Sequence, residues 1–222
     1  MRCNEMHQAS LIPQASIDNR RVVAVFDVDG TLTTSDSLLA FLRIHHGNIG
    51  FVKILFQCAL QLALYALGAI SNHQAKSTLL RSAFKGQQYS SLQKSANGLI
   101  QHWWPRHQNA WTFQKLKEHQ AAGHTCLLLS ASLDIYLQPL AQELAVQDLI
   151  CTELAWQEEV CLGDWKTANC QGPEKLRRLE SWLYEKQLKR ENVAIYAYGD
   201  SSGDVPLLDW ADKAWLKGKI YK

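Results

Sequence analysis

The sequence predicts an α/β protein in which a parallel β-sheet is interrupted by one long helical insertion. Apolar, β-branched runs of strand length occur at 21–26, 125–129, 149–152 and 193–198. Such continuous hydrophobicity is typical of parallel strands that are buried on both faces. Between 35 and 107 the chain shows no strand pattern, whereas strands alternate with helices after residue 123. This order favours a sheet with helical crossovers and a helical domain inserted after its first strand.

Composition describes an ordinary globular protein. The 222 residues are 47% hydrophobic and 20% charged, with a formal net charge of +2. This balance gives no reason to expect a nucleic-acid partner. The six cysteines are scattered, with no CxxC pair, which favours a reduced, cytoplasmic compartment. The first twenty residues are polar and lack the apolar core of a signal peptide, so we predict a flexible tail over 1–20.

The insertion contains an unusually apolar segment at 51–70, which we interpret as one helix. Only Lys53, Gln57 and Gln61 interrupt it, and their spacing of four places them on one stripe. A run of about 20 apolar residues could cross a bilayer. The polar stripe instead favours a helix of a cap domain, either packed within that domain or lying at a membrane surface. We therefore expect that 51–70 could associate with the inner face of the membrane.

The remaining elements follow from local signals. Ser35-Asp36-Ser37 is typical of a helix N-cap, and Ser132 is predicted to cap a helix over 133–144. Residues 153–165 predict a strand pair, and 173–190 a helix with a solvated face. A short helix after Asp204 and a last strand over 214–216 complete the predicted sheet.

Acidic and hydroxyl residues follow three of the predicted strands: Asp27 and Asp29, Ser130, and Asp200 and Asp204. The ends of parallel strands meet in one crevice, so these side chains should converge. Asp27 and Asp29 are two apart in extended chain and should project together. Gly30 allows a sharp turn, after which Thr31 offers a hydroxyl and an amide. Clustered carboxylates suit Mg²⁺, and Lys175 at a helix start can supply the cation that a phosphate needs.

These residues resemble the four ordered motifs of the haloacid dehalogenase superfamily of phosphohydrolases. The motifs are Asp27-Val28-Asp29-Gly30-Thr31-Leu32-Thr33, the run ending in Ser130, Lys175, and Gly199-Asp200-Ser201-Ser202-Gly203-Asp204. The resemblance covers about 21–210. The inserted helices are similar to the C1-type cap of the branch that includes phosphoserine phosphatases. The segments Asn169–Lys175 and Ser130-Ala131-Ser132 look most like subfamily IB, some of whose members act on phosphatidylglycerophosphate. The resemblance implies a Rossmann-like core over 21–34 and 108–222 and a cap over 35–107.

The resemblance also implies roles. Asp27 would be the nucleophile that forms an aspartyl-phosphate, and Asp29 the general acid and base. Asp27, the main-chain carbonyl of Asp29, Asp200 and Asp204 would hold Mg²⁺. Ser130, Lys175 and Thr31 would bind the phosphoryl group.

Several alternatives stay open at this point. The expected activity is Mg²⁺-dependent hydrolysis of a small or lipid-linked phosphate monoester. A phosphoserine phosphatase-type activity and phosphoryl transfer to a sugar are alternatives on the same site. An alternative of another class is a membrane- or partner-binding protein with a vestigial site. Asp36 could face the substrate or cap a helix, and Arg81 could bind a substrate carboxylate or lie on a solvated helix face.

Overall fold

The computed structural model describes residues 20–222, apart from the side chains of Leu62 and Asn72. Its main sheet has the strand order β3-β2-β1-β6-β7-β8. The strands are β1 Arg21–Phe26, β2 Thr125–Leu133, β3 Asp148–Thr152, β6 Val193–Gly199, β7 Lys213–Leu216 and β8 Lys219–Ile220. All neighbours pair in parallel except β7 and β8. The predicted α/β fold with a parallel sheet is therefore confirmed.

The centre of the sheet is β1, which pairs with β2 and β6 on either side. Successive β1 residues point to opposite faces, so Ala24 and Phe26 join one apolar cluster, and Val23 and Val25 join the other. All four are fully buried. This two-sided burial is the physical reason for the continuous apolar run that the sequence displays.

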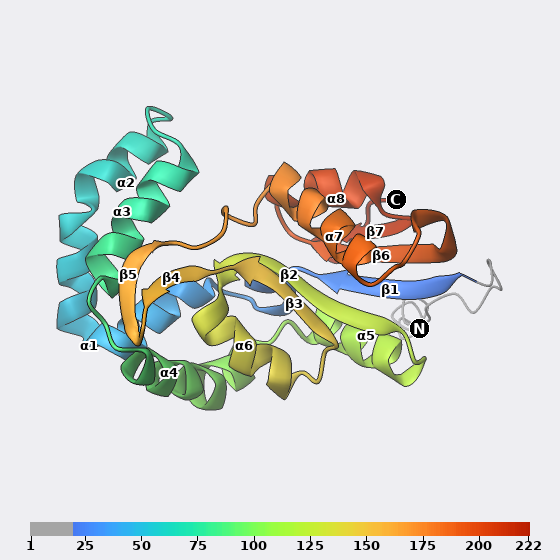
Figure 1. Ribbon diagram of the computed structural model, residues 1–222, viewed down its shortest axis with the longest axis horizontal. Helices are drawn as coiled ribbons and strands as arrows, with labels where there is room; N and C mark the ends of the chain where they lie inside the picture. Colours follow the sequence, from blue (N-terminus) through green and yellow to red (C-terminus); the bar gives the residue numbers. More distant parts are fainter. Residues whose placement is uncertain (1–19) are drawn as a thin grey trace, which may run out of the picture.

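Helices cover both faces of this sheet (Figure 1). They are α5 Ala110–Ala121, α6 Asp134–Glu143, α7 Pro173–Glu185 and α8 Val205–Trp210. Leu116 of α5 and Leu140 of α6 belong to the cluster of Phe26, whereas Leu179 of α7 and Leu207 of α8 belong to the other. The predicted cap of α6 is wrong: Leu133 occupies the N-cap position, and Ser132 lies within β2 and hydrogen-bonds elsewhere.

Four helices of the insertion lie between β1 and α5 in the chain: α1 Ser37–Gln57, α2 Ala59–Ala66, α3 Asn72–Phe84 and α4 Tyr89–Gly98. Asp36 is the N-cap of α1, as predicted, and its side chain accepts from Leu39 N at 2.8 Å. The single helix predicted over 51–70 is wrong, because the chain bends by 58° between α1 and α2, and α2 ends at Ala66. Among the described residues no single helix is long and apolar enough to cross a membrane. The bent pair of α1 and α2 is long and apolar enough when the two helices are taken together, by length and composition alone.

Short helical turns complete the description, at Val28–Leu32, Leu99–Trp103, Trp104–Arg106, Arg190–Asn192 and Ser202–Asp204. The two chain segments that enter and leave the inserted helices run side by side. Thr34 N donates to His107 O at 2.8 Å, and Asn109 N donates to Leu32 O at 2.8 Å. These contacts fall where the sequence places the ends of the cap, 34/35 and 107/108, and they support those boundaries as a proposal. Residues 1–19 of the predicted tail lie outside the described residues, and Arg20 pairs with Asp212 at 2.9 Å.

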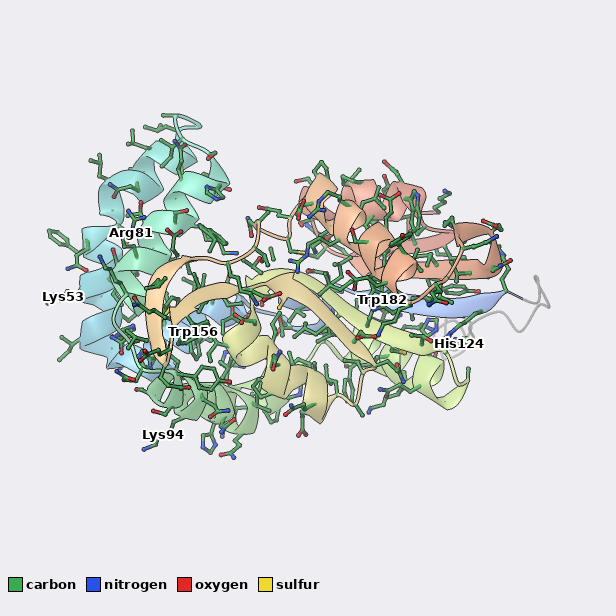
Figure 2. The ribbon with its side chains drawn as sticks, in the orientation of Figure 1. Lys53, Arg81, Lys94, His124, Trp156 and Trp182 are labelled. Carbon is green, nitrogen blue, oxygen red and sulfur yellow. The ribbon has the colours of Figure 1, made fainter. Side chains whose placement is uncertain are left out.

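The predicted strand pair is present as a hairpin of β4 Leu154–Gln157 and β5 Val160–Trp165. It packs against the inserted helices (Figure 1), where Gly86 N donates to Cys161 O and Tyr89 N to Glu159 O, both at 2.8 Å. The ring of Trp156 lies 5.2 Å from that of Tyr89 (Figure 2). The hairpin therefore extends the helical insertion, although its residues fall within the segment 108–222.

Candidate active site

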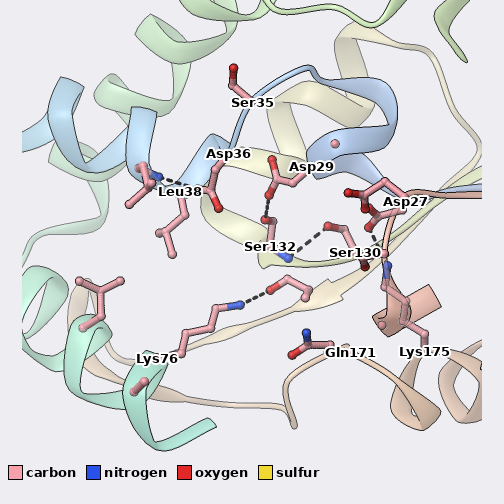
Figure 3. A pocket seen from close by; sticks show the side chains of 18 of the residues that line it. Asp27, Asp29, Ser35, Asp36, Leu38, Lys76, Ser130, Ser132, Gln171 and Lys175 are labelled. Carbon is pink, nitrogen blue, oxygen red and sulfur yellow. Dashed lines mark hydrogen bonds and ion pairs between the residues drawn. The ribbon is translucent and has the colours of Figure 1, made fainter. Parts of the chain in front are cut away.

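A cavity of about 600 Å³ lies where the carboxyl ends of the strands meet the inserted helices (Figure 3). The predicted site residues that line it are Asp27, Asp29, Ser130, Lys175 and Asp200. Asp204 and Thr31 are buried and touch this group through Lys175 and Asp27. The inserted helices contribute the opposite wall, formed by Leu38, Leu39, Tyr65, Ala75, Lys76 and Leu79. The structure thus brings all the predicted site residues to one place.

Asp27 directly follows β1, and its position is fixed by the sheet. Its backbone N–H donates to Tyr198 O at 3.0 Å, which continues the pairing of β1 with β6. Its carboxylate accepts from Lys175 Nζ at 2.6 Å and from Thr31 Oγ1 at 3.4 Å. Burial raises the pKa of Asp27 to about 7, because the nearby Lys175 ammonium only partly offsets the loss of water.

Lys175 lies in the first turn of α7, and its ammonium group contacts two of the acids. Gly172 and Pro173 precede it, and Pro at a helix start needs no backbone donor. Its Nζ also lies 2.5 Å from Asp204 Oδ1. Burial favours the neutral amine, but Asp27 and Asp204 outweigh that effect and raise the pKa of Lys175. Burial likewise favours neutral Asp204, but Lys175 and the amides of Asp200 and Ser201 lower its pKa overall.

Asp27, Asp200 and Asp204 form a group that could hold a metal ion, since one oxygen from each lies within 4.8 Å of the others. A Cβ added to Gly30, whose φ is +76°, would lie 2.3 Å from Asp200 Oδ2, so only glycine fits this turn. Lys175 is the single cation in direct contact with this group among the described residues. The excess of carboxylate charge and the all-oxygen donor set fit a hard divalent cation such as Mg²⁺.

Asp29 has a different environment, made of hydroxyl and amide donors. Ser37 N donates to Oδ1 at 2.8 Å, Ser37 Oγ donates to Oδ2 at 3.0 Å, and Ser132 Oγ donates to Oδ2 (Figure 3). Burial and the charge of Asp36 raise the pKa of Asp29, although these hydrogen bonds oppose the shift. The sequence analysis missed Ser37 and Ser132 as partners. The spacing of Ser132 from Ser130, two residues on one strand, is a signal that could have identified it.

Ser130 is buried near the end of β2 and lines the cavity. Its Oγ accepts from Ser132 N at 3.2 Å. Because the hydroxyl oxygen is oriented by this amide, its O–H can donate toward a ligand in the cavity.

Lys76 is a cavity residue that the sequence analysis also missed. From α3 its Nζ donates to Ala131 O at 2.5 Å and to Asn169 Oδ1 at 3.2 Å (Figure 3). Burial lowers its pKa to about 8, against the opposing charges of Asp29 and Asp36. Its place three and four residues before the buried Leu79 and Leu80 is a detectable signal, a lysine within an apolar stripe.

The sequence left two alternatives open for each of Arg81 and Asp36. Arg81 is exposed and lies 3.8 Å from Asp164. Asp36 both lines the cavity and caps α1.

The fold and the site define a class of protein, the α/β proteins that hold acidic residues and a lysine at parallel strand ends beneath inserted helices. Residues 24–209 match the family of haloacid dehalogenase-like hydrolases, and the chain belongs to this family. The prediction of the family from the motif residues is confirmed.

The chain is also similar to a curated protein and to solved structures. Protein CicA of Caulobacter vibrioides is 29% identical over 195 residues, which are 86% of this chain and 84% of that protein. A crystal structure of a protein of unknown function from Bordetella pertussis Tohama I has a TM-score of 0.76 and 23% identity, covering 88% of this chain and 89% of that one. A phospho-aspartyl intermediate analogue of phosphoserine phosphatase has a TM-score of 0.61 and 15% identity, covering 88% and 85%. At these identities the two structures establish the shared fold.

Proposed function

We propose that the protein is a Mg²⁺-dependent phosphomonoester hydrolase that works through an aspartyl-phosphate on Asp27. The observation that carries the proposal is the setting of the Asp27 carboxylate. It lines the cavity, contacts Lys175 at 2.6 Å and shares a potential metal position with Asp200 and Asp204. Membership of a hydrolase family supports the reaction class.

In the first step, a carboxylate oxygen of Asp27 attacks phosphorus and the bond between phosphorus and the ester oxygen breaks. Asp29 donates its proton to the departing oxygen, a role that its raised pKa favours. Lys175 and the Ser130 hydroxyl hold non-bridging phosphoryl oxygens as negative charge spreads over them.

In the second step, water attacks phosphorus and the bond to Asp27 breaks, which restores the carboxylate and releases inorganic phosphate. Asp29, now ionised, accepts the proton of the attacking water. Mg²⁺, held by Asp27, Asp200, Asp204 and the main-chain carbonyl of Asp29, would supply positive charge that neutralises the phosphoryl oxygens. Thr31, whose hydroxyl donates to Asp27, orients the nucleophile.

The cavity wall opposite the acids supports an amphipathic substrate. Leu38, Leu39 and Leu79 from α1 and α3 present apolar side chains, and Tyr65 of α2 adds an aromatic ring. A leaving group with apolar character would contact this wall while its phosphate lies against Ser130 and Lys175. The alternative of a vestigial site has no support, because every acid, hydroxyl and lysine of the four motifs is in place.

The test is Asp27→Asn, which keeps the shape of the side chain and removes the nucleophile. We expect p-nitrophenyl phosphate hydrolysis with Mg²⁺ to fall by about a thousandfold or more. Asp209→Asn is the matched control, because Asp209 is exposed on α8 and an amide oxygen can still accept from Tyr221. Far-UV circular dichroism should show both variants folded. Hydrolysis by folded Asp27→Asn at the parental rate would remove Asp27 as nucleophile.

A further inference from the structure

The outer surface of α1 and α2 carries a row of exposed apolar side chains, which we call the outer stripe. It consists of Ile49, Val52, Phe56, Leu60 and Leu67, with exposed fractions of 89%, 62%, 82%, 66% and 81%. Ile49, Val52 and Phe56 are spaced by three and four residues and so share one side of α1. The other side of the same helix buries Phe51 and Ile54 in the core. Packing within the chain therefore does not explain the apolar character of the outer stripe, and exposed apolar patches mark interaction sites.

The charge of the insertion identifies the kind of surface that fits. Residues 37–107 of the insertion contain no acidic residue and seven Lys and Arg, whereas the rest of the chain carries the other 16 Lys and Arg and all 21 acids. Lys53 lies within the outer stripe, at the outer edge of α1 (Figure 2). Three acids, Glu158, Glu159 and Asp164, come from the hairpin, which packs on α3. The outer stripe is thus apolar and belongs to a set of helices, α1 to α4, that contain basic but no acidic side chains, which is complementary to an anionic surface.

The two helices that carry the outer stripe also contribute residues to the cavity. Tyr65 of α2 and Leu39 of α1 line the cavity and are 43% and 44% exposed. They lie on the same two helices as Phe56 and Leu60. A surface that covers α1 and α2 would therefore contact helices that also form part of the cavity wall.

We propose that the outer stripe docks on an anionic lipid surface and that phosphomonoester headgroups of this surface are the substrates. This inference rests on the proposed phosphatase function. The 58° bend between α1 and α2 suits a helix pair that lies in the interface, with its apolar side chains among acyl chains and Lys53 among headgroups. An anionic membrane attracts each basic residue near its surface, and the helices α1 to α4 contain no acidic residue that would oppose this attraction.

Binding is tested by co-sedimentation of the full chain with vesicles of phosphatidylcholine alone or of equimolar phosphatidylcholine and phosphatidylglycerol. We expect binding to the anionic vesicles, weakened by added salt. Phe56→Glu should reduce this binding about tenfold or more, because it replaces an inserting ring with a negative charge. Tyr184→Glu is the matched control, since Tyr184 is 86% exposed on α7 at a distance from the cap, and it should bind as the parent does. A parental protein that stays in the supernatant at low salt, or a Phe56→Glu variant that binds fully, would overturn the proposal.

Two further measurements separate this inference from the proposed function and from self-association. Phe56→Glu should hydrolyse p-nitrophenyl phosphate in solution at the parental rate, because Phe56 does not line the cavity. Its release of phosphate from phosphatidic acid in anionic vesicles should fall about tenfold with its binding. Equal release by both proteins would refute the substrate class and leave the phosphatase intact, whereas parental activity of Asp27→Asn would remove the proposed nucleophile and leave vesicle binding unaffected. A dimer by light scattering that Phe56→Glu converts to monomer would identify the stripe as an interface between copies and overturn membrane docking.

Discussion

Asp27 and Asp29 are two copies of the same side chain, two residues apart, that the fold places in different chemical settings. Asp27 contacts a buried ammonium at 2.6 Å, whereas Asp29 accepts from hydroxyl and amide groups of Thr33, Ser37 and Ser132. An ammonium stabilises a carboxylate more strongly than neutral donors do. The pair is therefore arranged for one carboxylate to attack and the other to carry a proton, which is the division of roles in the proposed reaction.

Lys175 is expected to be essential for stability as well as for activity. Its ammonium lies between Asp27 and Asp204 at 2.6 Å and 2.5 Å, and its side chain is 4% exposed. Lys175→Met would leave both buried carboxylates without their cation. We expect the free energy of unfolding at neutral pH, measured by urea denaturation without divalent cations, to fall by about 3–5 kcal/mol.

The matched control for this prediction is Lys186→Met, near the end of α7. Lys186 pairs with Asp148 at 2.9 Å, but its side chain is 46% exposed. Water screens that pair, so its loss should cost less than about 1 kcal/mol. Equal losses for the two variants would show that the buried contacts of Lys175 contribute no more than a surface ion pair.

At this scale the sequence predicts residues that follow strands more readily than residues that come from the inserted helices. Asp27, Ser130 and Asp200 are predictable because strand ends converge whatever the details of packing. Lys76 reaches the cavity from α3, and Ser37 reaches Asp29 from α1. The orientation of both side chains depends on how these helices rotate against the sheet. No local pattern determines that rotation.

Whole elements show the same contrast. The strands are predictable because β1 must be apolar on both faces, and the hairpin because polar turn residues separate its strands. The bend after α1 is not predictable, since the sequence around Cys58 contains neither Gly nor Pro and includes the good helix formers Leu55 and Ala59. Its cause is tertiary, as Ile54 and Cys58 pack into the core while the chain turns over α3.

The contact of α5 with β6 predicts a pH dependence of stability. His119 of α5 is fully buried, with Nδ1 2.7 Å from His124 Nδ1 and Nε2 2.9 Å from the Tyr198 hydroxyl oxygen. Burial lowers the pKa of His119 from 6.5 to about 3. The folded protein thus keeps this ring neutral while the unfolded chain binds a proton below pH 6.5. The stabilisation is complete above that pH and is lost as the pH falls from 6.5 toward 3.

This dependence can be measured by urea denaturation at several pH values. Between pH 6.5 and 5.5 the parent should lose about 1 kcal/mol more than His119→Gln, which cannot titrate. His102→Gln is the control, because His102 is exposed and its removal should leave the parental dependence. Parallel pH profiles for the parent and His119→Gln would contradict the assignment of this proton to His119.

The whole molecule is organised around a cavity that neither of its two parts encloses alone. The sheet supplies the acids, and the inserted helices supply the apolar wall with Lys76. From the sequence, the position of the insertion is predictable because it follows the strand pattern of β1 and precedes the helix α5, which packs on the sheet. The attachment of the hairpin to α3 and α4 is not, because these contacts join segments far apart in the chain that share no local pattern.

Metal binding should change the stability of the whole molecule. Asp27, Asp200 and Asp204 crowd three carboxylates around one lysine, so a divalent cation that binds only the folded state should raise the melting temperature. Saturating Mg²⁺ is expected to raise it by about 5 °C or more in differential scanning fluorimetry, and EDTA should reverse the shift.

Asp200→Asn provides the decisive comparison. Burial and the charge of Asp204 raise the pKa of Asp200, so a neutral amide should make the metal-free protein at least as stable as the parent. The same change removes a charged oxygen donor, so the Mg²⁺-induced rise should shrink to a small fraction of the parental one. Asp209→Asn, which alters an exposed acid of α8, should keep the full rise. If Mg²⁺ raised the melting temperature of Asp200→Asn as much as that of the parent, the cation would bind elsewhere. The group of Asp27, Asp200 and Asp204 would then not be the metal site.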